Sequence, residues 1–304
     1  MHYTPAVPDN LQSVFAAHSS EAQALLTLTW VLFIGAAIIF VVVAALVYIA
    51  IRRRPAWLGS ERAIVAGGIV FPVVVLTLLL VYALKLVAAP RDTAPGLRVE
   101  VTGYQWWWRV RYLTADGALD FETANEIRLP VGKRAEVLLA AHDVIHSFWV
   151  PRLNSKLDMI PGRVNRTTLS ADTEGVYRGQ CAEFCGGPHA LMSLHVVAVA
   201  PDAFEQWRAV QRQPATTSEP AFAAHCAVCH TVRGTDARGR LGPDLTHVAG
   251  RVALGAGVLR NDAATLAAWI SASQHWKPGN LMPSFGHLAP AELERISGYV
   301  GTLR

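Results

Sequence analysis

The chain has 304 residues, of which 52% are hydrophobic and 16% charged. That length leaves room for about two domains, and the composition is too apolar for an ordinary soluble protein. The formal net charge is only +4, and no basic cluster with interleaved aromatic residues occurs outside one short loop. Nucleic acid is therefore excluded as a main partner.

Two long uncharged runs lie near the N-terminus: residues 22–51 and 63–84 contain no Asp, Glu, Lys or Arg. Either run is long enough to cross a hydrocarbon core of about 30 Å, which takes about 20 helical residues. A pair of buried helices in a large soluble core is disfavoured at this length without a charge. The sequence predicts a transmembrane hairpin with helices at about 22–51 and 63–88, inside an N-terminal region 1–90.

The connector between the two runs predicts their orientation. It carries four arginines and one glutamate: Arg52, Arg53, Arg54, Arg62 and Glu61. Because basic loops tend to stay in the cytoplasm, we expect both ends of the chain on the periplasmic or extracytoplasmic side of the cell (inner) membrane. We expect no cleavable signal peptide before residue 21, since that stretch has neither a basic n-region nor an apolar h-region.

After the hairpin the pattern changes to short alternating runs separated by Pro and Gly, within residues 91–200. Such spacing predicts a soluble β domain, an antiparallel sandwich or barrel. Residues 201–219 predict a short amphipathic helix and a linker. The remainder, 220–304, predicts an all-α domain with one helix capped by Asn261 or Asp262 and another that opens at Pro290.

The helical domain contains the motif Cys226-Ala227-Val228-Cys229-His230. Two thiols at this spacing can add across the vinyl groups of one porphyrin edge, and the following histidine then binds the iron. A disulfide or half of a zinc site is the alternative, but no second ligand pair lies nearby. An extracytoplasmic location favours covalent haem c.

A low-spin haem needs a second axial ligand, and Met282 is the only methionine after the haem motif. At this point residues 219–304 resemble the class I cytochromes c. "LGPDL" is similar to the family's loop, and the resemblance implies that the carbonyl of Pro243 positions His230. "LMPSF" is similar to its methionine loop, and the last helix, with Tyr299, to the helix that packs on the first.

A second cluster follows the spacing Cys181-x3-Cys185-x3-His189-x2-Met192. Thiolates, imidazole and thioether suit copper better than magnesium, calcium or manganese. A lone pair of cysteines at this spacing would more often form a disulfide. A copper site would need one more histidine, and spacing alone leaves three choices open: His142, His146 and His195.

"DVIHSFWVP", "PGRVNRTTL" and "GQCAEFCGGPHALM" resemble subunit II of haem–copper cytochrome c oxidases, over about residues 20–200. The resemblance implies a cupredoxin-like fold that holds the dinuclear copper centre CuA. Cys181 and Cys185 would bridge both coppers and spread one electron over them, and His146 and His189 would each bind one. Met192 and the carbonyl of Glu183 would be axial ligands.

The same resemblance implies further roles. The Glu183 side chain would reach a magnesium shared with subunit I. In "GYQWWWRV", Trp106 occupies the position of the tryptophan through which electrons enter, whereas Trp107 and Trp108 are expected to be packing residues. One departure is that Val65, seven residues before Pro72, stands where relatives often carry a proton-channel glutamate.

The order of modules resembles the caa-type oxidases, whose subunit II carries its own cytochrome c. The resemblance implies an electron-input subunit of a terminal oxidase, which works with subunits I and III and an external donor such as a cytochrome c or another small redox protein. Electrons would pass through haem c and CuA to subunit I, where oxygen is reduced to water and protons are translocated. We expect no catalytic residue in this chain itself, since neither apolar run contains histidine.

Two alternatives stay open. One is a CuA-containing nitric oxide reductase subunit, which turnover with nitric oxide would identify. The other is a membrane-anchored electron-transfer protein without a catalytic partner, which would purify without large haem-bearing subunits.

Overall fold

In the computed structural model, residues 12–88 and 96–304 are described. The chain forms two compact units, Gln23–Asp92 and the combination of Met1–Ala22 with Thr93–Arg304. The predicted boundary at residues 90 and 91 lies outside the described residues.

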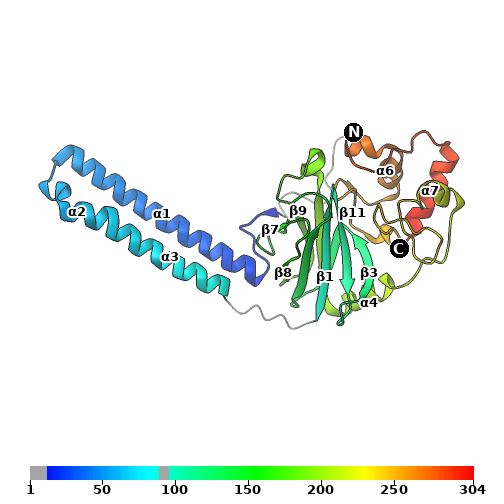
Figure 1. The fold of residues 1–304 in the computed structure, drawn as a ribbon, viewed down its shortest axis with the longest axis horizontal. Helices are drawn as coiled ribbons and strands as arrows, with labels where there is room; N and C mark the ends of the chain where they lie inside the picture. Colours follow the sequence, from blue (N-terminus) through cyan, green and yellow to red (C-terminus); the bar gives the residue numbers. More distant parts are fainter. Residues whose placement is uncertain (1–11, 89–95) are drawn as a thin grey trace. The chain divides into compact units, whose positions relative to one another are not determined.

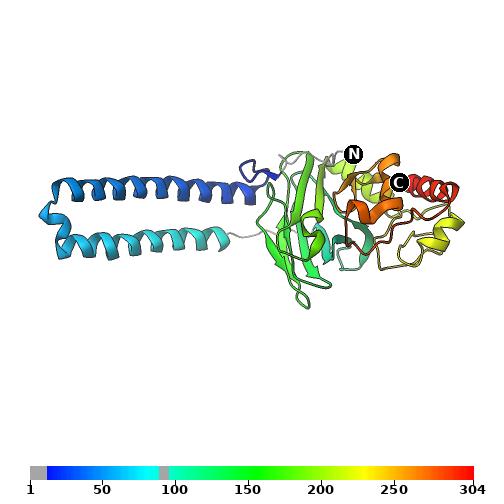
Figure 2. The same cartoon turned by 90° about the horizontal axis from the view of Figure 1, so that it is seen from above.

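The first unit is an antiparallel pair of helices joined by a short turn, drawn in blue and cyan (Figures 1 and 2). Two helices are long and apolar enough to cross a membrane, Ser20–Arg53 and Glu61–Leu86. Their large side chains face outward, as in Phe40, which is 73% exposed. Such a surface is stable in lipid, where apolar side chains need no burial within the protein. The predicted hairpin of two apolar helices is confirmed.

The helical segments of this unit follow each other closely in the chain. They are α1 (Ser20–Arg53), η2 (Ala56–Gly59), α2 (Glu61–Val65), η3 (Ala66–Val70) and α3 (Phe71–Ala88). The segment η3 is a π-helix, and the N–H of Phe71 bonds to the carbonyl of Ala66, five residues back. Pro72 follows directly and has no N–H to donate, so the wider turn lies where the helical hydrogen-bond ladder is interrupted.

The second unit contains a β domain of two five-stranded sheets. The first sheet has the order β3-β2-β1-β5-β8 and the second β4-β10-β9-β6-β7. Their bounds are β1 (Leu97–Tyr104), β2 (Trp107–Leu113), β3 (Leu119–Ala124), β4 (Glu126–Pro130), β5 (Ala135–Ala141), β6 (His146–Trp149), β7 (Leu157–Met159), β8 (Asn165–Leu169), β9 (Gly175–Cys181) and β10 (Ser193–Val199). Alternate residues of β1 are buried between the sheets, which is the period of a strand with one face in a core.

The prediction of a sandwich or barrel is confirmed, but its antiparallel pairing is wrong at two places. β1 pairs with β5 in parallel, and β4 pairs with β10 in parallel. The alternation of side chains is the same in both kinds of ladder, so the sequence pattern cannot separate them. The parallel pairs join strands that are not consecutive in the chain, so they depend on where the connecting segments cross from one sheet to the other.

The helix α4 (Pro201–Gln211) closes one end of the β domain. Its Trp207 packs on the rings of Tyr112 and Phe121, each at 5.4 Å between centroids. Arg208 and Arg212 both bind the carboxylate of Asp120 on β3, at 2.9 and 2.7 Å. This helix therefore belongs to the packed structure of the domain.

The remaining residues form a small helical domain with one short hairpin. Its elements are α5 (Pro220–His225), η5 (Val248–Gly250), β11 (Ala253–Leu254), β12 (Leu259–Arg260), α6 (Ala263–Trp276) and α7 (Pro290–Thr302), the last two in orange and red (Figure 1). Asp262 caps α6, with its carboxylate accepting from the N–H of Thr265. The last helix packs on the first through Phe222 and Tyr299, 5.3 Å apart. The domain limits 91–200, 201–219 and 220–304 stay predictions.

Replacing Asp120 by Asn should lower the free energy of unfolding at neutral pH by about 1–3 kcal/mol, because two arginines lose a buried partner. Burial raises the pKa of Asp120, but the hydrogen bonds from Arg212 and Arg208 outweigh it and the net pKa is lowered. The stabilisation is thus present above the unfolded-state pKa of about 4 and is lost as the pH falls through the folded-state value.

The measurement is denaturant unfolding of both proteins at neutral and acidic pH, with the exposed Asp172→Asn as a matched control. A difference between wild type and Asp120→Asn that stays constant down to acidic pH would contradict this account.

Candidate metal centre

Five sulfur and nitrogen side chains gather where the loop between β9 and β10 meets the start of β6. They are His146, Cys181, Cys185, His189 and Met192. The backbone positions them, because the N–H of Cys181 donates to the carbonyl of Met192 at 2.9 Å. This hydrogen bond holds the two ends of the loop between β9 and β10 next to each other. His146 opens the neighbouring strand, where Phe148 pairs with Cys181.

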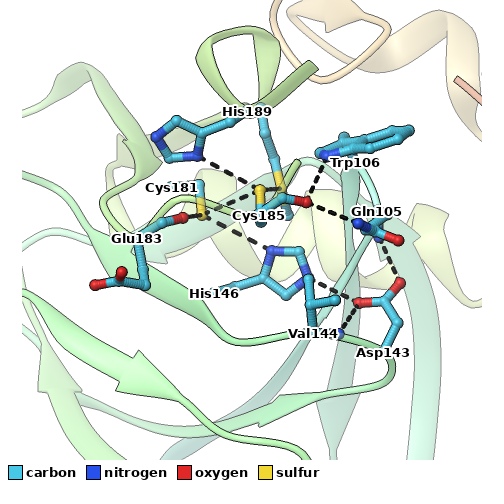
Figure 3. Close-up of polar contacts among 10 residues, drawn as sticks. Gln105, Trp106, Asp143, Val144, His146, Cys181, Glu183, Cys185 and His189 are labelled. Carbon is cyan, nitrogen blue, oxygen red and sulfur yellow. Dashed lines mark hydrogen bonds and ion pairs between the residues drawn. The ribbon is translucent and has the colours of Figure 1, made fainter. Parts of the chain in front are cut away.

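The cysteine sulfurs lie at the centre of the cluster, 3.8 Å apart and not bonded to each other (Figure 3). Cys181 Sγ is 3.8 Å from His146 Nδ1, and Cys185 Sγ is 3.4 Å from His189 Nδ1. Met192 Sδ lies 3.8 Å from Cys185 Sγ. The carbonyl of Glu183 accepts from the Cys181 thiol at 3.2 Å, so its oxygen also faces the cluster.

Burial opposes the thiolate form of both cysteines, but hydrogen bonds favour it at Cys181. Cys181 is 5% exposed and Cys185 3% exposed. The pKa of Cys181 is lowered, first by its contact with Cys185 and then by His146 and backbone groups, against the opposing effect of burial. Thiolates are the form of cysteine that binds metals.

The donor set fits copper. Two imidazole nitrogens, a thioether and a carbonyl each lie within 3.8 Å of one of the two thiol sulfurs. Soft sulfur donors select copper over magnesium or calcium. Of the three histidines that spacing left open, only His146 lies at the sulfurs. His142 stacks on Tyr104 at 4.4 Å, and His195 is buried on β10.

The sequence did not single out Asp143. Its carboxylate accepts from His146 Nε2 at 2.9 Å and from the N–H groups of Gln105 and Val144, each at 2.7 Å (Figure 3). This fixes the imidazole so that Nδ1 points at Cys181. Burial alone would lower the pKa of His146, but the bonds with Cys181 and Asp143 raise it overall. A polar residue three positions before a ligand histidine is the signal that could have identified it.

Trp106 contacts the cluster directly. Its indole N–H donates to the carbonyl of Cys185 at 2.9 Å, and the Gln105 amide donates to the same oxygen at 2.8 Å. Trp107 stacks on Tyr104 outside this contact, and Trp108 is fully buried in the core. Only Trp106 of the three tryptophans therefore touches a cysteine of the cluster.

The helical domain holds the second predicted site. His230 Nδ1 donates to the carbonyl of Pro243 at 2.8 Å, which leaves Nε2 as the candidate ligand atom. Cys226 and Cys229 carry free thiols. A Cβ at position 242 would lie 2.5 Å from the His230 ring, so glycine is needed beside this imidazole. These residues fit haem c attached through both thiols.

The loop around Met282 is held by side chains. Its N–H donates to Asn280 Oδ1 at 2.8 Å, and its carbonyl accepts from Ser273 Oγ at 2.9 Å and Gln274 Nε2 at 2.8 Å. Met282 itself is half-buried against the core of the helical domain. A thioether in a fixed loop suits an axial iron ligand.

Comparison with known proteins gives two family matches: "Cytochrome C oxidase subunit II, periplasmic domain" over residues 113–199 and "Cytochrome c" over residues 218–304. Cytochrome c oxidase subunit 2 of Alkalihalophilus pseudofirmus is 32% identical over 295 residues, which is 88% of this chain and 84% of the relative. The subunit 2 of Bacillus sp. (strain PS3) is 30% identical over 225 residues, covering 68% of this chain and 62% of the relative.

Among solved structures, the periplasmic domain of subunit II of the cytochrome oxidase of Bradyrhizobium japonicum is similar. It has 33% sequence identity and covers 38% of this chain and 93% of its own, with a TM-score of 0.36.

Gly103 on β1 lies against the candidate ligand His146, and an added Cβ would come within 2.7 Å of its imidazole ring. Gly103→Ala should displace the ring and weaken copper binding by about tenfold, in the range seen when ligand orientation is disturbed. Competition with a copper chelator measures this, with Gly96→Ala as control, because nothing lies within 4 Å of a Cβ there. Equal copper affinity in the two variants would refute a role of His146 as a ligand.

Asp143→Asn should weaken copper binding by roughly 10- to 100-fold. The carboxylate accepts three hydrogen bonds, and an amide would turn an N–H group toward one of these donors, so the His146 ring would no longer be held. The change is measured by copper content after dialysis against a chelator series. The exposed Asp158→Asn is the matched control and should bind like wild type. Unchanged binding in Asp143→Asn would show that this carboxylate does not orient the imidazole.

Proposed function

The chain belongs to the cytochrome c oxidase subunit 2 family, and from that premise we propose that it relays electrons from an external donor to the haem–copper centre of subunit I. It is an oxidase subunit with a cytochrome c domain, and so an electron-input component of an oxidoreductase. Its helices anchor it in a membrane, with the C-terminal domains outside the cytoplasm. The relay order, its donor and the coupled proton translocation are the proposed part.

Each cofactor has its own residues in this proposal. Haem c is attached to Cys226 and Cys229 and bound by His230 and Met282. The two coppers of CuA are bound by Cys181, Cys185, His146, His189, Met192 and the carbonyl of Glu183. Both groups, when bound, take up and release single electrons.

The chain's own residues would keep the geometry of the copper centre fixed during transfer. Asp143 holds the His146 imidazole, the Cys181 to Met192 hydrogen bond closes the loop, and Trp106 holds the carbonyl of Cys185. A rigid donor set changes little between redox states, which lowers the cost of moving an electron. The single observation that carries the proposal is the convergence of five soft side chains beside a cytochrome c domain.

Three finer points belong to the proposal. The membrane is the cell (inner) membrane, with the N-terminus outside. The partners are subunits I and III, and the donor is a cytochrome c or another small redox protein. A magnesium ion at the interface with subunit I would take the Glu183 carboxylate as one ligand, and carboxylate oxygen is a ligand of the kind magnesium prefers.

The test is Cys181→Ser in the oxidase complex purified from native membranes. We expect the mixed-valence copper EPR signal to vanish while the haem c spectrum stays. Oxygen consumption should fall by at least about 100-fold, since losing a bridging ligand exceeds the 10–100-fold cost of losing an outer partner.

The reciprocal variant Cys229→Ser serves as the matched control, and it should disturb haem attachment while the copper signal persists. Wild-type oxygen consumption in Cys181→Ser would refute the relay through this cluster.

A further inference from the structure

Lys277, at the end of α6, is a buried lysine at the contact between the β domain and the helical domain. It is 2% exposed. In the part of the chain that the structure describes, no carboxylate forms an ion pair with it, and burial lowers its pKa to about 7. Burying an ammonium group costs several kcal/mol unless its donors are satisfied. A buried apolar side chain would fill the same space at less cost.

The three donors of Lys277 are all used, and two of them cross to the β domain. Nζ donates to the carbonyl of Trp106 at 2.7 Å and to the carbonyl of Leu191 at 2.8 Å. The third bond goes to Gly255 of its own domain at 2.9 Å. Because an ammonium has three N–H donors, this set is complete. The two acceptors across the interface belong to residues adjoining the copper cluster.

The acceptors adjoin candidate copper ligands, and the backbone of Lys277 connects through Asn280 to the candidate haem ligand Met282. Trp106 donates from its indole to the carbonyl of Cys185 at 2.9 Å, and Leu191 precedes Met192 and packs on the core of the helical domain. On the other side, the carbonyl of Lys277 accepts from Asn280 Nδ2 at 2.7 Å. Asn280 Oδ1 in turn accepts from the N–H of Met282 at 2.8 Å.

Other hydrogen bonds hold the same interface without Lys277. Ser193 N–H donates to the carbonyl of Ala256 at 2.9 Å, and Arg128 donates to the carbonyl of Gly250 at 2.9 Å. Glu126 accepts from the N–H of Val252 at 2.7 Å. The domains therefore stay in contact without Lys277, but among the hydrogen bonds of the described residues those of Lys277 join the turn between β1 and β2, at Trp106, to the loop that leads to Met282.

We propose that Lys277 is a positioning residue that docks the loop of Met282 against Trp106 and thereby sets the distance for electron transfer within this chain. The inference rests on the proposed function for its electron-transfer part, while the docking itself rests on the hydrogen bonds alone. It requires no cofactor contact by Lys277.

The test compares Lys277→Met and Lys277→Gln with wild type in the purified complex. Methionine is unbranched, reaches to the position of Cε and removes all three donors, whereas glutamine has a side chain of the same length as methionine and carries two N–H donors. Photoreduction of the haem followed by optical detection of copper reduction gives the rate within the chain. We expect a fall of at least about tenfold in Lys277→Met and a smaller one in Lys277→Gln, since small misplacements are costly in rate.

Two further readouts separate docking from a general loss of structure. Hydrogen exchange of the backbone around residues 188–193 and 252–258 should rise in Lys277→Met, in complexes with or without cofactors. The copper EPR signal and the haem spectrum should stay as in wild type. Arg128→Gln is the matched control, because it loosens the interface away from Trp106 and should leave the rate within about twofold of wild type.

The outcomes are distinct. An unchanged rate and unchanged exchange in both Lys277 variants would overturn the inference and leave the proposed function intact. An equal fall in Arg128→Gln would also overturn it, because any weakening of the interface would then suffice. A wild-type complex without the copper signal would overturn the proposed function and the electron-transfer role together, while exchange would still decide the docking.

Discussion

The copper cluster depends on one backbone hydrogen bond, from Cys181 N–H to the carbonyl of Met192. It closes the loop that carries Cys185 and His189, so all four side chains leave from one edge of the second sheet. A loop free to open would place the sulfurs at varying distances. The conformational entropy lost in ordering them would then reduce the affinity for a metal. The adjacent strand β6 then supplies His146 to the same point because its residue Phe148 pairs with Cys181.

A second constraint acts between the two extracytoplasmic domains. The linker after α4 allows many arrangements by composition, but the helical domain makes specific hydrogen bonds to the β domain in this structure. Several of these reach residues beside the copper cluster. The covalent link and the defined interface act together, which keeps the effective concentration of one domain at the other high.

Much of this was predictable from the sequence because the signals are local. A run of thirty uncharged, mostly apolar residues is long enough to cross a membrane as a helix and forms few other stable structures. The motif that begins at Cys226 places its donors within five residues and the one that begins at Cys181 within twelve, so spacing alone restricts the chemistry. The cap of α6 and the opening of α7 at Pro290 are also local: the sequence left Asn261 and Asp262 as the two choices for the cap, and the structure selects Asp262.

The rest depends on contacts between distant residues. The parallel pairs of β1 with β5 and β4 with β10 follow from crossovers that no strand pattern records. From the residues alone, His142, His146 and His195 were equivalent, and only the pairing of β6 with β9 separates them. Nothing in the sequence distinguishes Lys277, since its partners across the interface lie 86 and 171 residues away along the chain.

The central claim is that both donor sets hold redox metals in one chain. The most direct measurement is EPR and optical spectroscopy with metal quantification on the complex purified from native membranes. The account predicts a mixed-valence dinuclear copper signal together with a low-spin c-type haem that remains covalently attached after denaturation. A c-type haem without that copper signal would contradict it, because Cys181 and Cys185 would then not bind copper and the relay would have no acceptor.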